Sequence, residues 1–272
     1  MDTPIVLLPE LVHMALGYLT LTGLCSIRLF VVMSIFPPAA DGVLQGTVRN
    51  AVVLLFSSYI AYGQPLAFSA TLSGTTLILI GLREAMIGLV LGLSASSVFW
   101  VAESAGYYID NLSGYNNAQV QNPMRTEQST PTAMLFQQIA IVAFWGLGGM
   151  TFLLGALYES YRWWPLTAST LAVSNVLEAF VLRQTDDLMQ MLMKLAAPMV
   201  MILVLIDLAF GYAAKSGGKL DVMGMSQPVK GAVTVLMLAL FASVFVDQVH
   251  GQLALMNFAA QIGEWVGIMP GR

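Results

Sequence analysis

The sequence predicts an all-α, polytopic membrane protein of helical hairpins. Only 10% of its 272 residues are charged and 57% are hydrophobic, whereas soluble domains carry about 25% charged residues. A helical span needs about 20 apolar residues, so the chain has room for about five to seven spans joined by short loops. We therefore expect residues 1–272 to form one membrane-embedded domain.

The N-terminal half contains three apolar segments that predict helices. The first runs from about Leu11 to Phe36, where Pro37-Pro38 ends it because proline has no N–H and restricts the residue before it. The second runs from about Val48 to Tyr62 and precedes a Gly-Gln-Pro break. A long third helix is expected from about Thr75 to Glu103.

The longest polar interruption follows this helix, from Gly106 to Pro131. Gly106 and Gly114 permit unusual backbone angles. The residues expected to satisfy local N–H groups are Asp110, Asn111, Asn116 and Asn117. Irregular backbone at membrane depth is tolerated only where protein buries it or water lines it. A plug-like loop that holds its shape yet moves is one interpretation, and an ordinary exposed connection is the other.

The C-terminal half alternates apolar and polar stretches. An apolar segment covers Thr132 to about Tyr158, and helical spacing over Ser169 to Arg183 predicts an amphipathic surface helix. Two further spans are expected, from about Leu188 to Tyr212 and from Val229 to Val249. The aromatic residues typical of an interfacial belt are Tyr158, Tyr161, Trp163 and Trp164. Lysines cluster at the loop at 213–228, and the tendency of basic residues to stay on the cytoplasmic side predicts that this loop is cytoplasmic. They are Lys215, Lys219 and Lys230.

Seven charged residues lie within or beside the apolar segments, where an unpaired charge costs several kcal/mol. They are Arg28, Arg83, Glu84, Glu103, Lys194, Asp207 and Asp247. They predict a polar conduit or contacts between subunits; the alternative is pairing inside the helix bundle or snorkelling at span ends. A small-residue face around Gly88 and Gly92 predicts close helix packing, either within the chain or with another subunit.

The sequence carries no enzyme, metal or nucleic-acid motif. The segment around Lys219 lacks the first glycine and the final Ser or Thr of a phosphate-binding loop. His13 and His250 stand far apart without a zinc pattern, and Cys25 has no partner for a disulfide. No basic run suggests nucleic acid. We expect no catalytic residue, no metal and no cofactor.

Two stretches, from Leu82 to Leu93 and from Phe99 to Asn111, resemble the central region of the type III secretion export apparatus T subunit, a relative of flagellar FliR. The resemblance continues, in order, through Asn122-Pro123, Glu127 to Pro131, Leu154 to Tyr161, Trp164-Pro165, Ala197-Pro198, Asp207 to Gly211 and Ser226 to Lys230. The segments from Gln128 to Pro131 and from Tyr158 to Tyr161 favour the injectisome branch. The stretch from Gly217 to Val222 departs from the family pattern.

This resemblance implies a structural and gating subunit of the bacterial inner-membrane entry channel for secreted proteins. Its partners would be the sister R, S, U and V subunits, inner rod or needle adaptor proteins, exported unfolded proteins and membrane lipid, in a helical export gate partly raised to the periplasmic side. The residues assigned to the channel plug are Gly106, Asp110, Asn111, Gly114, Asn116, Pro123, Gln128, Ser129 and Pro131. The residues assigned to subunit contacts are Arg28, Arg83, Glu84, Gly88, Gly92, Asp207 and Lys230.

Two other classes of membrane protein, a transporter and an enzyme, would leave different patterns in the sequence. A small-molecule secondary transporter acting alone would show inverted repeats with paired broken helices, and the sequence shows no such repeat. An intramembrane hydrolase would need a catalytic pair, and no motif indicates one.

Overall fold

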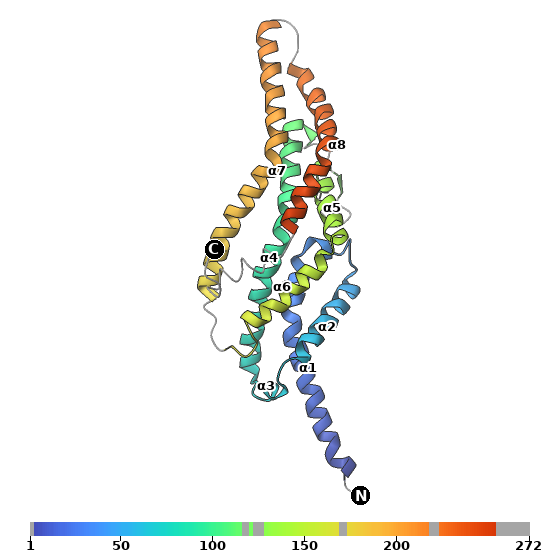
Figure 1. Ribbon diagram of the computed structural model, residues 1–272, viewed down its shortest axis with the longest axis vertical. Helices are drawn as coiled ribbons and strands as arrows, with labels where there is room; N and C mark the ends of the chain where they lie inside the picture. Colours follow the sequence, from blue (N-terminus) through green and yellow to red (C-terminus); the bar gives the residue numbers. More distant parts are fainter. Residues whose placement is uncertain (1–2, 116–119, 122–127, 169–172, 218–222, 254–272) are drawn as a thin grey trace. The chain divides into compact units, whose positions relative to one another are not determined.

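The structure, a computed structural model, describes residues 3–115, 120–121, 128–168, 173–217 and 223–253 (Figure 1). Its helices are α1 (Thr3–Ile35), α2 (Gly46–Tyr62), α3 (Leu66–Ala70), α4 (Gly74–Ser113), α5 (Pro131–Gly146), α6 (Gly149–Trp163), α7 (Val173–Gly217) and α8 (Ser226–Leu253), with 3-10 turns η1 (Pro37–Ala39) and η3 (Met223–Met225). One antiparallel ribbon joins β1 (Val120–Gln121) to β2 (Gln128–Ser129). The all-α prediction is confirmed.

The chain divides into two compact units. Of the described residues, the first unit comprises 3–95, 153–168 and 173–178, and the second comprises 96–115, 120–121, 128–152, 179–217 and 223–253. Each is described separately below, because α4, α6 and α7 contribute residues to both.

In the first unit, α1 packs against α2 and α3 (Figure 1). The Tyr18 hydroxyl donates a hydrogen bond to the Ser58 carbonyl at 2.9 Å, which ties α1 to α2. The buried apolar residues of α1 follow the spacing of one helix face and are Leu21, Leu24, Cys25, Leu29, Val32 and Met33. α1 ends at Ile35, before Pro37-Pro38, as the missing proline N–H predicts.

The small-residue face of α4 packs against α1 inside this unit. A Cβ atom on Gly88 would lie 2.6 Å from the Arg28 carbonyl oxygen, and one on Gly92 would lie 3.2 Å from the Val32 Cα. Real Cβ atoms essentially never come within 3.0 Å of a backbone atom, so at position 88 only glycine allows this helix contact. Of the two interpretations of the small-residue face, the structure favours packing within the chain.

In the second unit, α4 continues about ten residues beyond its expected end. Ala102, Ala105 and Ile109 are buried at helical spacing, so apolar packing sustains the helix to Ser113. Gly114 then adopts φ +84°, the left-handed conformation that glycine commonly supplies just after a helix. The polar loop expected from Gly106 therefore begins only at this glycine.

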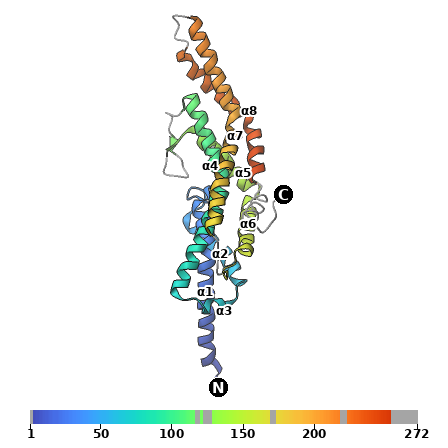
Figure 2. The same cartoon turned by 90° about the vertical axis from the view of Figure 1, so that its left-hand side faces the viewer.

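The apolar segment expected from Thr132 to Tyr158 is broken into α5 and α6, which are bent by 75°. The break is glycine-rich, and Gly148 adopts φ +70°. Within the second unit, α5 contacts α8 (Figure 2).

α7 is one helix of 45 residues that includes most of the predicted amphipathic segment and the predicted span that follows it. The sequence between them carries polar residues but neither glycine nor proline, so nothing local ends the helix. Pro198 lies inside α7; such prolines are tolerated in membrane helices because neighbouring groups satisfy the freed backbone. Residues 169–172 of the predicted amphipathic segment lie outside the described residues.

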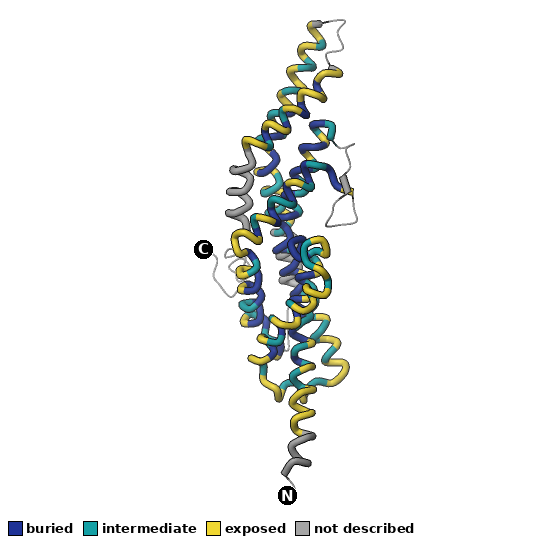
Figure 3. Tube along the Cα trace, turned by 90° about the vertical axis from the view of Figure 1, so that its right-hand side faces the viewer, coloured by how far each residue is buried: buried dark blue, intermediate teal, exposed yellow. Residues whose placement is uncertain are grey.

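Within the described residues, fewer helices than expected are long and apolar enough to cross a bilayer. They are Glu10–Ile35, Gly74–Ser113 and Gln184–Ser216, with the bent pair α5–α6 as a fourth if it forms one span. α2 has only 17 residues, below the length of a full span. Large apolar side chains nevertheless stay exposed along several of these helices (Figure 3), as expected where lipid or other subunits replace water.

Candidate functional site

A fully buried ion pair joins α1 to α4 in the first unit. Nη2 of Arg28 lies 2.7 Å from Oε2 of Glu84, and both side chains are 0% exposed. Arg28 Nε also donates to the same carboxylate oxygen at 2.8 Å, so two guanidinium nitrogens share one acceptor. In the low dielectric of a helix bundle such a pair is tolerated only with good geometry and further hydrogen bonds.

Those further bonds come from α6. Arg28 Nη1 donates to the Ser160 hydroxyl at 2.7 Å, and Nη2 donates to the Trp164 carbonyl at 3.0 Å. The guanidinium carbon lies 3.8 Å from the centre of the Tyr161 ring, a cation–π contact. Tyr161 and Trp164 are buried, so these two residues surround Arg28 instead of forming the predicted interfacial belt.

Arg83 fastens the segment that follows α6. Its guanidinium donates to the carbonyls of Pro165, Leu166 and Ala168, and Nη2 lies 3.1 Å from Oε1 of Glu84. These carbonyls belong to the turn after α6, outside any helix, and the guanidinium supplies donors to backbone groups that no helix ladder satisfies. For Arg28, Arg83 and Glu84 the structure favours the internal alternative over contacts with another subunit.

In the second unit, Asp110 binds the N-terminus of α5. Its Oδ2 atom accepts a hydrogen bond from the Thr132 N–H at 2.8 Å and another from the Ala133 N–H at 3.4 Å. The side chain is 0% exposed. The first N–H groups of a helix have no partner within it, and their partial positive charge favours a carboxylate. Asp110 thus fixes the end of α4 to the start of α5 from within a helix, not from a loop.

Gly106 is required by a close contact in this unit, and Gly114 by its backbone conformation. A Cβ atom on Gly106 would overlap the Ala133 backbone and lie 2.7 Å from the Thr132 carbonyl carbon. Gly114 has φ +84°, which other residues rarely adopt. Gly106 therefore permits tight packing of α4 against α5, and Gly114 permits the turn that follows α4.

The remaining residues assigned to the plug lie on a short ribbon or outside the described chain. Ser129 pairs with Val120 and Gln128 with Gln121, which gives β structure where irregular loop was expected. Pro131 is the first residue of α5, a favoured place for proline. The Asn111 amide donates to its own helix, at the Tyr107 carbonyl, and is exposed. Asn116 and Pro123 lie outside the described residues.

A second ion pair connects α7 and α8. Lys230 Nζ lies 3.0 Å from Oδ1 of Asp207, with the lysine side chain 6% exposed and the aspartate 45% exposed. These two residues, predicted to contact other subunits, thus pair with each other. The Asp207 side chain is still half-exposed, so part of its surface is not covered by this chain. The predicted loop at 213–228 is helical up to Gly217 and again from Ser226, and residues 218–222 lie outside the described chain.

Several residues of these clusters were not anticipated from the sequence. Ser160 and Gln227 make central contacts, but a lone serine or glutamine in an apolar context carries no distinguishing signal. Gln137 on α5 donates to Oε2 of Glu103 at 2.7 Å and thereby supplies the partner that this intramembrane acid needed. The general rule that a buried charge must be paired could have directed a search to such neutral polar residues.

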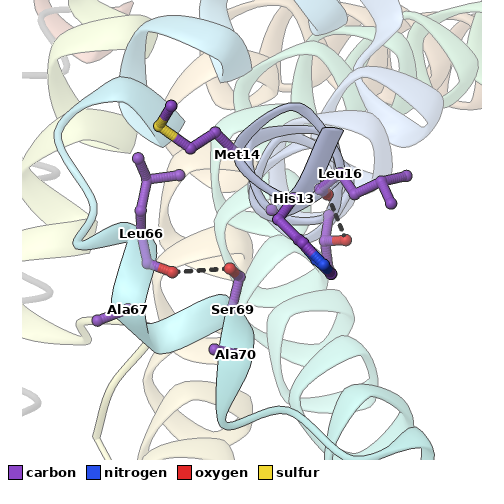
Figure 4. Close-up of a pocket in the computed structure, with 9 residues that line it drawn as sticks. His13, Met14, Leu16, Leu66, Ala67, Ser69 and Ala70 are labelled. Atoms are coloured by element: carbon purple, nitrogen blue, oxygen red, sulfur yellow. Dashed lines mark hydrogen bonds between the residues drawn. The ribbon is translucent and has the colours of Figure 1, made fainter. Parts of the chain in front are cut away.

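A shallow pocket of about 510 Å³ lies beside α1 and α3 in the first unit (Figure 4). The Thr20 hydroxyl in its wall donates to the Leu16 carbonyl, and the Ser69 hydroxyl donates to the Leu66 carbonyl. Both hydroxyls are thus engaged by their own helices, and the exposed His13 adds a polar ring to the wall. None of the residues predicted for gating or assembly lines this pocket.

Long apolar helices, buried ion pairs and broken spans define a polytopic all-α membrane protein. Residues 19–256 match the family described as bacterial export proteins, family 1. The chain belongs to this family, which includes the T subunits of type III secretion export apparatus and their flagellar relatives, as its motifs suggested.

Three relatives illustrate the match. The chain is 30% identical to the Yop proteins translocation protein T of Yersinia pestis, over 76% of this chain and 80% of that protein. It is 31% identical to the secretion system apparatus protein SsaT of Salmonella typhimurium, over 57% and 60% respectively. It is 27% identical to the flagellar biosynthetic protein FliR of Bacillus subtilis, over 65% and 69%.

Proposed function

We propose that this chain is a structural and gating subunit of a type III secretion export channel. The segment between α4 and α5 would narrow the channel in its closed state and move aside for an exported, unfolded protein. The names of the relatives, which refer to translocation and secretion apparatus, support an export role. The chain would have no catalytic activity, and its partners would supply the energy.

The observation that carries this proposal is the way both ends of that segment are held. Asp110 binds the α5 N-terminus, and Gly114 turns the chain sharply out of α4. The ribbon residue Ser129 is 3% exposed, and its hydroxyl makes no hydrogen bond within the described residues. A buried polar group without a partner costs about 1–3 kcal/mol. The two ends of the segment are thus fixed while the Ser129 hydroxyl stays unsatisfied, an arrangement that would suit a gate that must open.

The proposed partners follow from the family and from the exposed apolar surface. Sister R, S, U and V subunits, inner rod or needle adaptor proteins and lipid would cover the exposed apolar side chains of α2, α7 and α8. We place the assembly in the bacterial inner membrane, partly raised to the periplasmic side. The assembly contacts assigned to Gly88, Gly92, Asp207 and Lys230 would then be indirect, through the helices that these residues hold together.

Deletion of residues 116–122 tests the gate. The export complex carrying the deletion would be purified with its sister subunits, its composition checked by native mass spectrometry, and its ion conductance measured in planar bilayers. We expect a steady leak that the parent complex lacks, because the shortened segment cannot reach across the channel. A control complex replaces the same residues with a Gly-Ser linker of equal length. An assembled deletion complex that stays as tight as its parent would exclude the gating role.

A further inference from the structure

The N-terminus of α5 is capped by a residue of another helix. Asp110 of α4 accepts hydrogen bonds through Oδ2 from the Thr132 N–H at 2.8 Å and from the Ala133 N–H at 3.4 Å. Pro131, the first residue of α5, has no N–H. These are therefore the first two N–H groups of the helix, which no carbonyl of the same helix can satisfy.

Thr130 stands where a helix is ordinarily capped by its own chain. It is the N-cap residue of α5, with extended backbone angles of φ −81° and ψ 155°. Threonine is a favoured N-cap residue, and its hydroxyl oxygen accepts a hydrogen bond from the N–H two or three positions further on. Those are the N–H groups that Asp110 holds, and the Thr130 side chain makes no capping hydrogen bond. Its backbone thus has the capping conformation while its hydroxyl is not used.

The Thr130 hydroxyl has no other role within the part of the chain that the structure describes. Thr130 is 7% exposed, and its Oγ1 atom has no hydrogen-bond partner there. A buried hydroxyl without a partner is unfavourable. Rotation about the single Cα–Cβ bond turns an N-cap hydroxyl toward the first N–H groups of its helix. The hydroxyl therefore gains a partner as soon as Asp110 leaves.

The cap that Asp110 provides is incomplete. Its bond to the Ala133 N–H is longer than the usual range of about 2.7–3.2 Å for such bonds. Its other oxygen, Oδ1, is buried and makes no hydrogen bond to any described residue. Replacement of Asp110 by Thr130 consequently sacrifices one good hydrogen bond and one weak one, and it frees a carboxylate to satisfy both of its oxygens elsewhere.

Asp110 reaches α5 only because two helix backbones touch. A Cβ atom on Gly106, one turn before Asp110 in α4, would overlap the Ala133 backbone. The obstacle is backbone, which cannot turn aside as the end of a flexible side chain can. Separation of α4 from α5 at this point therefore withdraws Asp110 from both N–H groups together.

We propose that α5 exchanges caps: when the end of α4 separates from α5, the Thr130 hydroxyl takes the N–H groups that Asp110 releases. The two helices can then part without leaving the start of α5 uncapped. This cap exchange stands on the contacts of the second unit. Its use in opening the export channel rests on the proposed gating function.

A double-mutant cycle tests the cap exchange. Asp110→Ala removes the cap in use, and Thr130→Val removes the unused hydroxyl while keeping the shape of the side chain. The unfolding equilibrium constant of the full-length chain is measured in sodium dodecyl sulfate mixed micelles. The matched control is Ser129→Ala, because Ser129 is 3% exposed and its hydroxyl also lacks a partner among the described residues, but it precedes the N-cap position.

Thr130→Val alone should leave the unfolding constant unchanged or lower it, since the hydroxyl makes no hydrogen bond in the parent chain. In the Asp110→Ala background it should raise the constant about fivefold, the effect of losing an N-cap. Ser129→Ala should have the same effect in both backgrounds. An equal effect of Thr130→Val in both backgrounds would overturn the cap exchange.

A second cycle displaces Asp110 without changing it. Gly106→Ala forces the α4 backbone away from Ala133, so Thr130→Val should again raise the unfolding constant about fivefold in that background. If Asp110→Ala does not fold, this cycle decides, and additivity in it would overturn the proposal. Failure of both single variants to fold would also contradict it, because the Thr130 cap should keep either one folded.

The rate of protein export by cells that carry Thr130→Val separates the cap exchange from the gating function. Coupling in the cycles together with slower export than in the parent supports both. Coupling together with export at the parent rate supports the cap exchange and contradicts its use in opening the channel. Additive cycles overturn the cap exchange whatever the export rate, and leave the gating function to the deletion experiment above.

Discussion

The buried pair Arg28–Glu84 allows a prediction in which two substitutions of similar size lower the free energy of unfolding by unequal amounts. Glu84→Gln removes the carboxylate and leaves the Arg28 guanidinium, 0% exposed, with neutral partners alone among the described residues. These are the Ser160 hydroxyl, the Trp164 carbonyl and the Tyr161 ring. Arg28→Met removes the cation instead. It leaves Glu84 with Arg83, whose Nη2 lies 3.1 Å from Oε1.

The magnitudes follow from what each variant leaves behind. An uncompensated buried charge costs about 3–5 kcal/mol, so Glu84→Gln should lower the free energy of unfolding by that amount. Arg28→Met loses charge-assisted hydrogen bonds but keeps a compensated carboxylate and an apolar side chain in the same space. We expect it to cost about 2 kcal/mol. The double variant should cost about 2 kcal/mol less than the sum, since the two residues interact directly.

The assay is unfolding of the full-length chain by sodium dodecyl sulfate in mixed micelles, followed by tryptophan fluorescence. The matched control is Arg162→Met, which breaks a pair with Glu159 at 3.1 Å whose side chains are 78% and 36% exposed. Exposed pairs contribute at most about 1 kcal/mol, so this control should change little. If Glu84→Gln costs no more than Arg28→Met, or no more than the control, the role assigned to Arg83 as the second cation is wrong.

Three more substitutions test the packing and pairing of both units by the same unfolding assay. Gly88→Ala should cost about 1–3 kcal/mol because its Cβ meets the α1 backbone; Gly23→Ala, with no atom within 4 Å, should be neutral or stabilising, and equal effects would refute the packing argument. Asp110→Asn should cost about 1–2 kcal/mol through loss of a charged helix cap, and no change would contradict that role. Asp207→Asn should destabilise more than Lys230→Met, because it strands the buried partner instead of the half-exposed one; the reverse order would refute this reading.

The helices could be predicted from the sequence wherever apolar length and proline or glycine breaks coincide. Pro37-Pro38 ends α1, and the predicted α2 differs from the observed one by only two residues at its start. The end of α4 could not be predicted in the same way, because the stretch that contains Gly106 and Asp110 has the composition of a loop. Their place in a helix depends on contacts with α5, which no local pattern encodes.

The sequence predicted which charged residues need a partner, but not which residues those partners are. The rule that charges in apolar segments need partners correctly selected Arg28, Glu84 and Asp207, whereas Lys230 was selected only through the family resemblance. It could not decide whether those partners would come from this chain. Arg28 and Glu84 are 56 positions apart in the sequence, and only the crossing of α1 and α4 brings them together.

This internal pairing changes where specificity for sister subunits must come from. The ion pairs Arg28–Glu84 and Lys230–Asp207 are formed within the chain, so they are not free to select a partner. Between residues 201 and 212, large apolar side chains of α7 are instead exposed at helical spacing, at Met201, Leu205, Leu208 and Tyr212, beside the half-exposed Asp207. A mainly apolar face discriminates partners by shape more than by electrostatics. In the proposed assembly, the internal ion pairs would fix the helix positions, and the shape of these apolar faces would determine which subunit binds.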